Sequence, residues 1–308
     1  MSRGHARRRD HRRGPETLVR RGPARESAIL VAWRSGRAPD HHGVFFSTDN
    51  LVLTVAQAAC VAAPASGLPG WAQRLRTPAW ALVLPLSIAV VIGAIEIVPS
   101  TADVLTWVAL LLVPPGCALA LGWAARGARP VLALLATALL AVAWAYPADR
   151  FGQAATLVLI AGSAVTLGRL LAGAAPLTLL KLGIVAMAAV DAYLVFSSAL
   201  QAPNALLDAA APGSGLPQLQ SGSFGFAGLG YGDFFAAAVV GAILAAEHRG
   251  QVVAAVAMLA ISLAWDQLFL VYDVLPATIP PALTLIAYEG WVRRRARAAG
   301  PRGGVRAA

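Results

Sequence analysis

The sequence has few charged residues and little cysteine, and these shortages exclude several classes of protein. Charged residues make up 13% of the chain and hydrophobic residues 58%, which is far from the balance of an ordinary water-soluble domain. The two cysteines, Cys60 and Cys117, stand far apart and indicate no disulfide framework. The histidines have no zinc-ligand spacing, and the chain lacks a glycine-rich phosphate loop with its lysine. We therefore predict no metal, nucleotide or organic cofactor.

Long apolar segments are what the chain has in abundance. A membrane-crossing helix needs about 20 mostly apolar residues, because each adds about 1.5 Å across a hydrocarbon layer about 30 Å thick. Eight segments meet this requirement: Ala79–Val98, Val104–Ala124, Pro130–Pro147, Ala154–Gly173, Pro176–Leu200, Phe224–Ala246, Gln251–Val271 and Pro276–Val292. A ninth, Val44–Ala63, contains polar residues and fits either a further span or an interfacial helix. The fold class predicted is an all-α, polytopic membrane helix bundle of eight or nine transmembrane helices.

Charge and composition divide the chain into four regions. The first forty residues contain eleven arginines and no sustained periodicity, so residues 1–43 are predicted to be a disordered arginine-rich tail. Residues 44–78 hold the extra span or interfacial helix and a linker, residues 79–292 the helical membrane domain, and residues 293–308 a basic tail. Next to a membrane domain, such a tail indicates a topology signal. The predicted partners thus include membrane lipid and no nucleic acid.

The loop charges predict an orientation. Lys and Arg in short loops remain on the cytoplasmic side of a membrane. Arg74, Arg126, Arg249 and Arg293 mark ends that would all be cytoplasmic, whereas the loop 201–223 has no basic residue and is expected outside. Eight spans with both termini inside is the simplest solution. The arginine-heavy, lysine-poor composition favours a bacterial plasma membrane, with the protein as a multi-pass component.

Two acidic residues interrupt the apolar segments. Asp191 lies in the span 176–200, and Asp233 ends the string Gly228-Leu229-Gly230-Tyr231-Gly232-Asp233 in the next span. A carboxylate within hydrocarbon is costly, so it usually faces a cavity or a partner and marks function. Each aspartate lies about nine residues from the outside end of its predicted span, which is a depth of about 13 Å. The two carboxylates are therefore expected at one level on neighbouring helices.

A pair of carboxylates at one level has a specific chemical use. Two close carboxylates tend to share one proton, because both cannot ionise comfortably. The ionised member then activates water while the protonated member hydrogen-bonds the scissile carbonyl, which is acid-base hydrolysis without a covalent intermediate. Gly230 and Gly232 permit an irregular turn and close approach of a substrate strand.

The chain resembles the GxGD intramembrane aspartyl proteases, the presenilins, signal peptide peptidases and their microbial homologues. The resemblance rests on Asp191, on Gly230-Tyr231-Gly232-Asp233 and on Pro281-Ala282-Leu283, in that order along residues 176–292. It implies a presenilin-like fold in which residues 176–292 are the catalytic half. It also implies that Asp191 and Asp233 are the catalytic dyad, with Pro281, Ala282 and Leu283 as a structural support beside it. The implied substrates are transmembrane segments of other proteins, with amino termini inside if the charge-derived orientation holds.

The sequence departs from the family pattern at two positions. Val190 precedes the first aspartate where the family usually has Tyr, and Tyr231 is an unusual residue at the variable position of GxGD. These changes are consistent with altered substrate choice or with loss of proteolysis.

Two other functions fit the acidic residues. One is a prepilin-peptidase-like GxGD protease, although that motif usually continues into lysine, whereas Phe234 follows here. The other is a proton-coupled transporter that uses Asp191, Asp233 and Asp266 as a relay. Asp266 lies toward the same outside face, where it either pairs with one of the two carboxylates or sits at the interface.

Overall fold

The computed structural model describes residues 47–67, 70–213, 215–272 and 274–298. The predicted tail 1–43 and residues 299–308 lie outside this part. The elements are α2 (Thr48–Ala62), α3 (Gly70–Arg74), η1 (Pro78–Leu82), α4 (Val83–Ile97), α5 (Thr101–Leu119), η2 (Ala120–Ala124), η3 (Pro130–Ala133), α6 (Leu134–Ala145), α7 (Arg150–Ala174), α8 (Leu177–Phe196), α9 (Gln201–Ala209), β1 (Ser221–Phe224), β2 (Ala227–Gly230), α10 (Tyr231–Ala246), α11 (Gln251–Asp266), η4 (Gln267–Leu270) and α12 (Ile279–Ala298). The predicted helical fold is confirmed, with a small two-stranded sheet added to it.

Several of these helices have the length and composition of membrane spans. Among the described residues, five are long and apolar enough to cross a membrane: Pro78–Ile97, Thr101–Ala124, Arg150–Ala174, Leu177–Phe196 and Gln251–Leu270. Many large apolar side chains face outward, as Leu111 and Leu134 do at 67% and 72% exposure. Such a surface would be costly in water, and it indicates a membrane-embedded protein.

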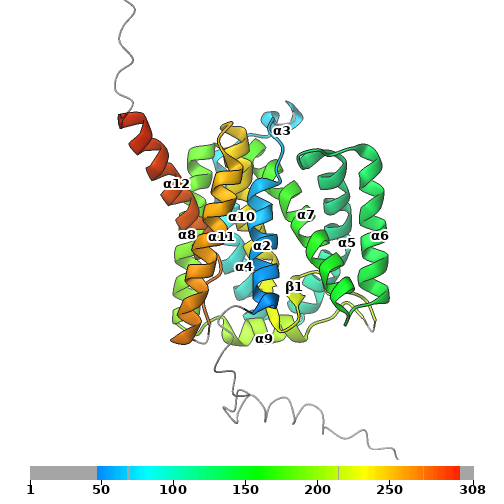
Figure 1. Cartoon of the computed structure of the whole chain (residues 1–308). Coiled ribbons are helices and arrows are strands. Elements are labelled where there is room, and N and C mark those ends of the chain that lie inside the picture. Colours follow the sequence, from blue (N-terminus) through cyan, green and yellow to red (C-terminus); the bar gives the residue numbers. More distant parts are fainter. Residues whose placement is uncertain (1–46, 68–69, 214, 273, 299–308) are drawn as a thin grey trace, which may run out of the picture. The chain divides into compact units, whose positions relative to one another are not determined.

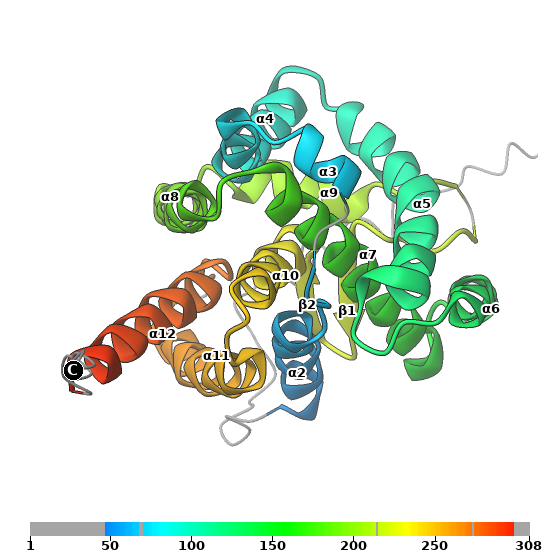
Figure 2. The same cartoon turned by 90° about the horizontal axis from the view of Figure 1, so that it is seen from above.

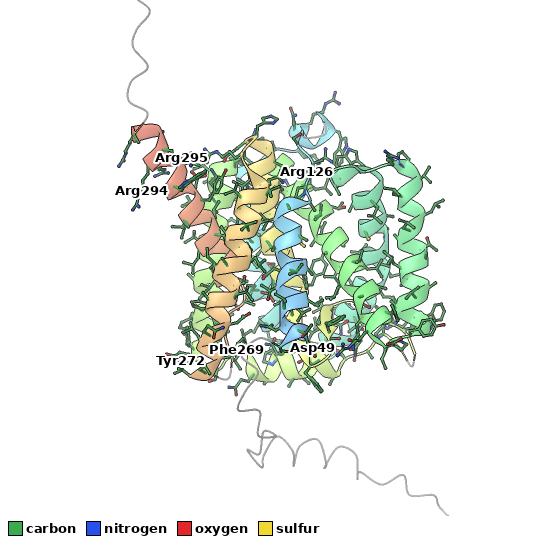
Figure 3. All side chains as sticks on the ribbon, in the orientation of Figure 1. Asp49, Arg126, Phe269, Tyr272, Arg294 and Arg295 are labelled. Carbon is green, nitrogen blue, oxygen red and sulfur yellow. The ribbon has the colours of Figure 1, made fainter. Side chains whose placement is uncertain are left out.

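The long helices lie side by side in one bundle, with the loops at its two ends (Figure 1). Arg126 and Arg294 lie at one end, here called the arginine end (Figure 3). Asp49 and Tyr272 lie at the other, together with α9 and the strands, and we call it the hairpin end. The described chain begins at the hairpin end, and α12 finishes at the arginine end.

Helix α7 forms the centre of the packing and contacts α2, α5, α6 and α10 (Figure 2). Small residues allow this close approach. A Cβ added at Gly168 of α7 would lie 2.8 Å from the backbone carbon of Ala238 in α10, and one at Gly241 of α10 would lie 2.4 Å from the Val61 carbonyl of α2. Close contact between backbones is how helices associate where lipid removes the hydrophobic driving force.

Helix α2 accounts for most of the weak ninth apolar segment. It stands among the long helices and does not lie across their ends (Figure 1), and it packs on α7, α10 and α11. Its polar residues Asp49, Thr54 and Gln57 are buried inside the bundle. The polar residues that interrupt the apolar pattern of this segment therefore face protein, as polar groups in an apolar bundle usually do.

The segment before α10 departs from the prediction. Residues 224–230 were expected to begin a membrane span, and residues 201–223 to be a loop. Instead, β1 pairs antiparallel with β2, and α9 precedes them. The turn contains Gly225 at φ +57°, a conformation that favours glycine. Asp49 accepts a hydrogen bond from the Phe226 N–H at 3.3 Å, and Gln153 accepts one from the Gly225 N–H at 2.9 Å. These polar contacts hold the hairpin against α2 and α7.

A group of ion pairs closes the arginine end. Lys181 of α8 donates to both Glu247 and Glu289, and Arg249 also donates to Glu289, at 2.7 Å. The contacts join α8, the end of α10 and α12. Lys181 and Glu289, which lie near helix ends, thus each find a protein partner. The predicted basic tail also begins within α12, which continues to Ala298.

Two glycine-to-alanine variants test this packing. Gly241→Ala is expected to lower the free energy of unfolding by about 1–3 kcal/mol, because the new methyl group meets the Val61 carbonyl. Gly93→Ala in α4 is the matched control, since nothing lies within 4 Å of its added Cβ, and it should be neutral or stabilising by up to about 1 kcal/mol. Thermal unfolding in detergent measures both. Equal midpoints for the two variants would contradict the close α2–α10 contact.

Candidate functional site

Asp191 lies on α8, five residues before the helix ends at Phe196, and only 9% of it is exposed. Its Oδ2 accepts two hydrogen bonds from Thr278, one from the hydroxyl at 2.6 Å and one from the backbone N–H at 3.3 Å. Thr278 is 3% exposed and immediately precedes α12. A buried carboxylate is thus oriented by two donors from a single residue.

Asp233 lies in the first turn of α10, two residues after the helix begins at Tyr231. Its Oδ2 accepts a hydrogen bond from the Gly230 N–H at 3.1 Å. A carboxylate at this position accepts a hydrogen bond from a backbone N–H that has no helical partner, and it interacts favourably with the positive end of the helix dipole. Both effects favour a helix that begins at this point. Asp233 is therefore nearer the helix end than predicted, because the hairpin occupies the first residues of the expected span.

Gln57 of α2 links the segment that carries Asp233 to the segment that contacts Asp191. Its Nε2 lies 3.3 Å from the Asp233 carbonyl oxygen and 3.5 Å from the Ala277 carbonyl oxygen. Ala277 is the neighbour of Thr278, which holds Asp191. One buried amide thus connects the start of α10 to the start of α12.

The two glycines of the GxGD motif, Gly230 and Gly232, have different neighbours. A Cβ added at Gly230 would lie 3.3 Å from the Asp233 Oδ2, closer than a side chain usually comes. At Gly232 the nearest atom would be the Met187 Cε, 4.0 Å away. Met187 is one turn before Asp191 on α8, so the GxGD segment faces the stretch of α8 that carries the first aspartate.

Tyr231, the variable residue of the motif, is directed into α7. Its hydroxyl lies 2.9 Å from the Ser163 Oγ, in a hydrogen bond whose donor is either group. Its role here is to fix the first turn of α10 against α7.

Pro281, Ala282 and Leu283 form the first turn of α12, three to five residues after Thr278. Pro281 and Ala282 are buried, and Leu283 is 39% exposed. Proline fits this turn because its missing N–H would have no helical partner there. The motif therefore fixes where α12 begins, directly after the residue that contacts Asp191.

Asp266 has a partner of its own. At the end of α11 it accepts a hydrogen bond from the Asn50 Nδ2 of α2 at 2.6 Å. The sequence predicted that Asp266 either pairs with Asp191 or Asp233 or sits at the interface. The hydrogen bond from Asn50 was not predicted. The described residues hold no group of three His, Cys, Asp or Glu side chains that is placed to bind a metal.

Sequence reasoning did not identify Thr278 or Gln57 as site residues. Gln57 is one of the polar residues of the weak ninth segment, and a polar residue in an apolar helix is a signal of a buried partner. Nothing in the sequence around Thr278 indicates a site residue, apart from the two prolines that follow shortly after it.

Comparison with known proteins identifies no relative: no protein-family model, no curated protein and no solved structure matches this chain.

The Tyr231–Ser163 contact is tested by a double-mutant cycle. Tyr231→Phe and Ser163→Ala each remove one hydroxyl, and the coupling free energy of the pair is expected to be about 1 kcal/mol in stability. Tyr193→Phe, which removes a hydroxyl from an exposed tyrosine of α8, should leave the unfolding midpoint unchanged. Additive effects of the two variants would show that the hydroxyls do not interact.

Proposed function

We propose that this protein is an intramembrane aspartic endopeptidase that hydrolyses peptide bonds within transmembrane segments, with Asp191 and Asp233 as its catalytic dyad. One observation carries the proposal. The helix segments that bear the two carboxylates face one another near the hairpin end, joined through Gln57, Ala277 and Thr278. A carboxylate within a membrane bundle usually marks function, and here two of them lie on helix segments that face one another.

The proposed reaction uses only the two carboxyl groups and water. The ionised carboxylate takes a proton from water as the water oxygen bonds to the peptide carbonyl carbon. The protonated carboxyl gives its proton to the carbonyl oxygen, which yields a neutral tetrahedral diol. When the diol collapses, the C–N bond breaks and the first carboxyl passes its proton to the leaving nitrogen. The second carboxylate recovers its proton from the diol hydroxyl, so the dyad ends as it began.

The proposed topology has nine crossings, made by α2, α4 to α8 and α10 to α12. The arginine end faces the cytoplasm, because Arg126, Arg129 and Arg249 lie in the turns between helices there. The dyad then opens toward the outer leaflet of a bacterial plasma membrane, and Thr48, where α2 begins, faces outside. Both chain termini were predicted to be cytoplasmic, but neither terminus belongs to the residues that the structure describes.

The proposed substrate is a transmembrane segment that unwinds near its cut site. A helical peptide bond is shielded by its own hydrogen bonds, so helix-destabilising residues are expected there. Strand β2 ends at Gly230 and, in the part of the chain that the structure describes, pairs only with β1. An extended substrate can hydrogen-bond to such a strand edge, three residues from Asp233.

A proton-coupled transporter is the second candidate function. It is favoured by a third carboxyl group, the half-buried Asp266, which lies at the same end of the bundle and accepts a hydrogen bond from Asn50. Groups that bind and release protons along a path form such relays. The two functions differ in whether a peptide bond or a solute is the substrate.

Cleavage of single-span reporter proteins by purified protein tests the dyad. Asp191→Asn and Asp233→Asn are each expected to lower the cleavage rate by at least about 1,000-fold, because each carboxyl is needed in both halves of the reaction. Asp103→Asn is the matched control, an exposed aspartate in the first turn of α5, and should cleave like the parent.

If the folded parent cleaves no reporter, while proton-dependent solute flux in liposomes requires Asp191 or Asp233, the protein is a transporter and the protease proposal is wrong.

Thr278 is expected to act as a positioning residue for Asp191. Thr278→Val removes the 2.6 Å hydroxyl bond to the carboxylate and should lower kcat by about 10- to 100-fold with little change in KM. Thr278→Ser keeps the hydroxyl and should restore most of the rate. Equal rates for the Val and Ser variants, at equal thermal stability, would show that the hydrogen bond has no part in catalysis.

A further inference from the structure

A stripe of polar residues runs along α2 inside the bundle. Asn50, Thr54 and Gln57 are spaced so that they share one face of the helix. Thr54 and Gln57 are 5% and 4% exposed, and Asn50, nearer the hairpin end, is half-buried. The stripe begins at the Asp266 side chain and ends at the Asp233 carbonyl.

Helix α11, which packs on α2, carries two buried donors that have no protein partner among the described residues. Within the described ranges, neither the Ser262 Oγ nor the Trp265 Nε1 makes a hydrogen bond, although both atoms are shielded from the exterior. Ser262 is 4% exposed. An unpaired buried donor costs about 1–3 kcal/mol, so such groups in native proteins usually bind ordered water.

The register of the two helices places Ser262 between the ends of the stripe. Helices α2 and α11 are in contact and run in opposite directions, and the Asn50–Asp266 bond aligns them. Moving four residues along each helix brings Thr54 to the level of Ser262, about 6 Å deeper than that bond. Gln57 and the Asp233 carbonyl lie about one further turn in.

We propose that α2 and α11 enclose a file of bound water molecules that runs from Asn50 and Asp266, past Ser262 and Trp265, to Asp233. The chemistry of its lining suits water, because Ser262 brings a hydroxyl and Trp265 an indole N–H that have no protein partner in the described ranges. Resting on the proposed function, this file supplies the water molecule consumed in each hydrolysis.

Pulsed hydroxyl-radical labelling with mass spectrometry tests the water site without relying on activity. Radicals made from bound water oxidise the side chains that it touches. Met258 is 0% exposed and one turn from Ser262, so it and Trp265 are the reporters. In the full-length protein both should be oxidised, and Ser262→Val, which fills the water position with a methyl group, should reduce their oxidation severalfold. Ser163→Ala is the matched control, since its buried hydroxyl already has a protein partner, and should change neither.

Cleavage rates of the same variants test the supply of water. Ser262→Val should slow turnover severalfold at an unchanged unfolding midpoint, and Ser262→Thr, which keeps the hydroxyl, should restore it. Equal oxidation of Met258 and Trp265 in the parent and Ser262→Val would overturn the water file. Reduced oxidation with unchanged cleavage would overturn its role as the supply route. A parent that shows the oxidation pattern but cleaves no reporter would support the water file and reject only the protease.

Discussion

A buried charged group in an apolar bundle must find a partner inside the protein, and this requirement shapes the structure. Arg169 of α7 donates to the carbonyls of Gly67 and Trp123 and stacks on the Trp123 ring, which ties two connecting segments to the central helix. Lys181 and Arg249 share two glutamates at the arginine end. Without these partners each charge would cost several kcal/mol, so the polar groups determine which helices are neighbours.

Helix α2 shows how far this constraint reaches. Asp49 holds the turn of the hairpin, Asn50 holds Asp266, and Gln57 joins the starts of α10 and α12. The helix least convincing as a membrane span in the sequence therefore contacts the hairpin, Asp266 and the starts of α10 and α12. Its low hydropathy and its structural importance have one cause, because a helix face that packs on α7, α10 and α11 can carry polar residues that lipid would reject.

The parts of the site that could be predicted depend on local sequence, and the parts that could not depend on contacts between residues far apart in the sequence. Asp191 and Asp233 were evident as charges in apolar segments, and their helices formed close to the predicted residues. Their depth was predicted wrongly for Asp233, because the glycine-rich stretch from Ser221 to Gly230 is apolar enough to resemble a span yet folds into a hairpin. Gly225 at positive φ, held by Gln153 and Asp49, stabilises that turn through contacts distant in sequence.

The sequence by itself determined the helical class, the approximate bounds of the long helices and the two acidic positions, because hydropathy and periodicity are local properties. Only the tertiary structure decided that α2 belongs to the bundle, that Thr278 orients Asp191 and that Tyr231 is directed into Ser163. Each of these depends on side chains more than sixty residues apart, and hydrogen bonds over such separations form only when helix packing has brought the donors and acceptors together.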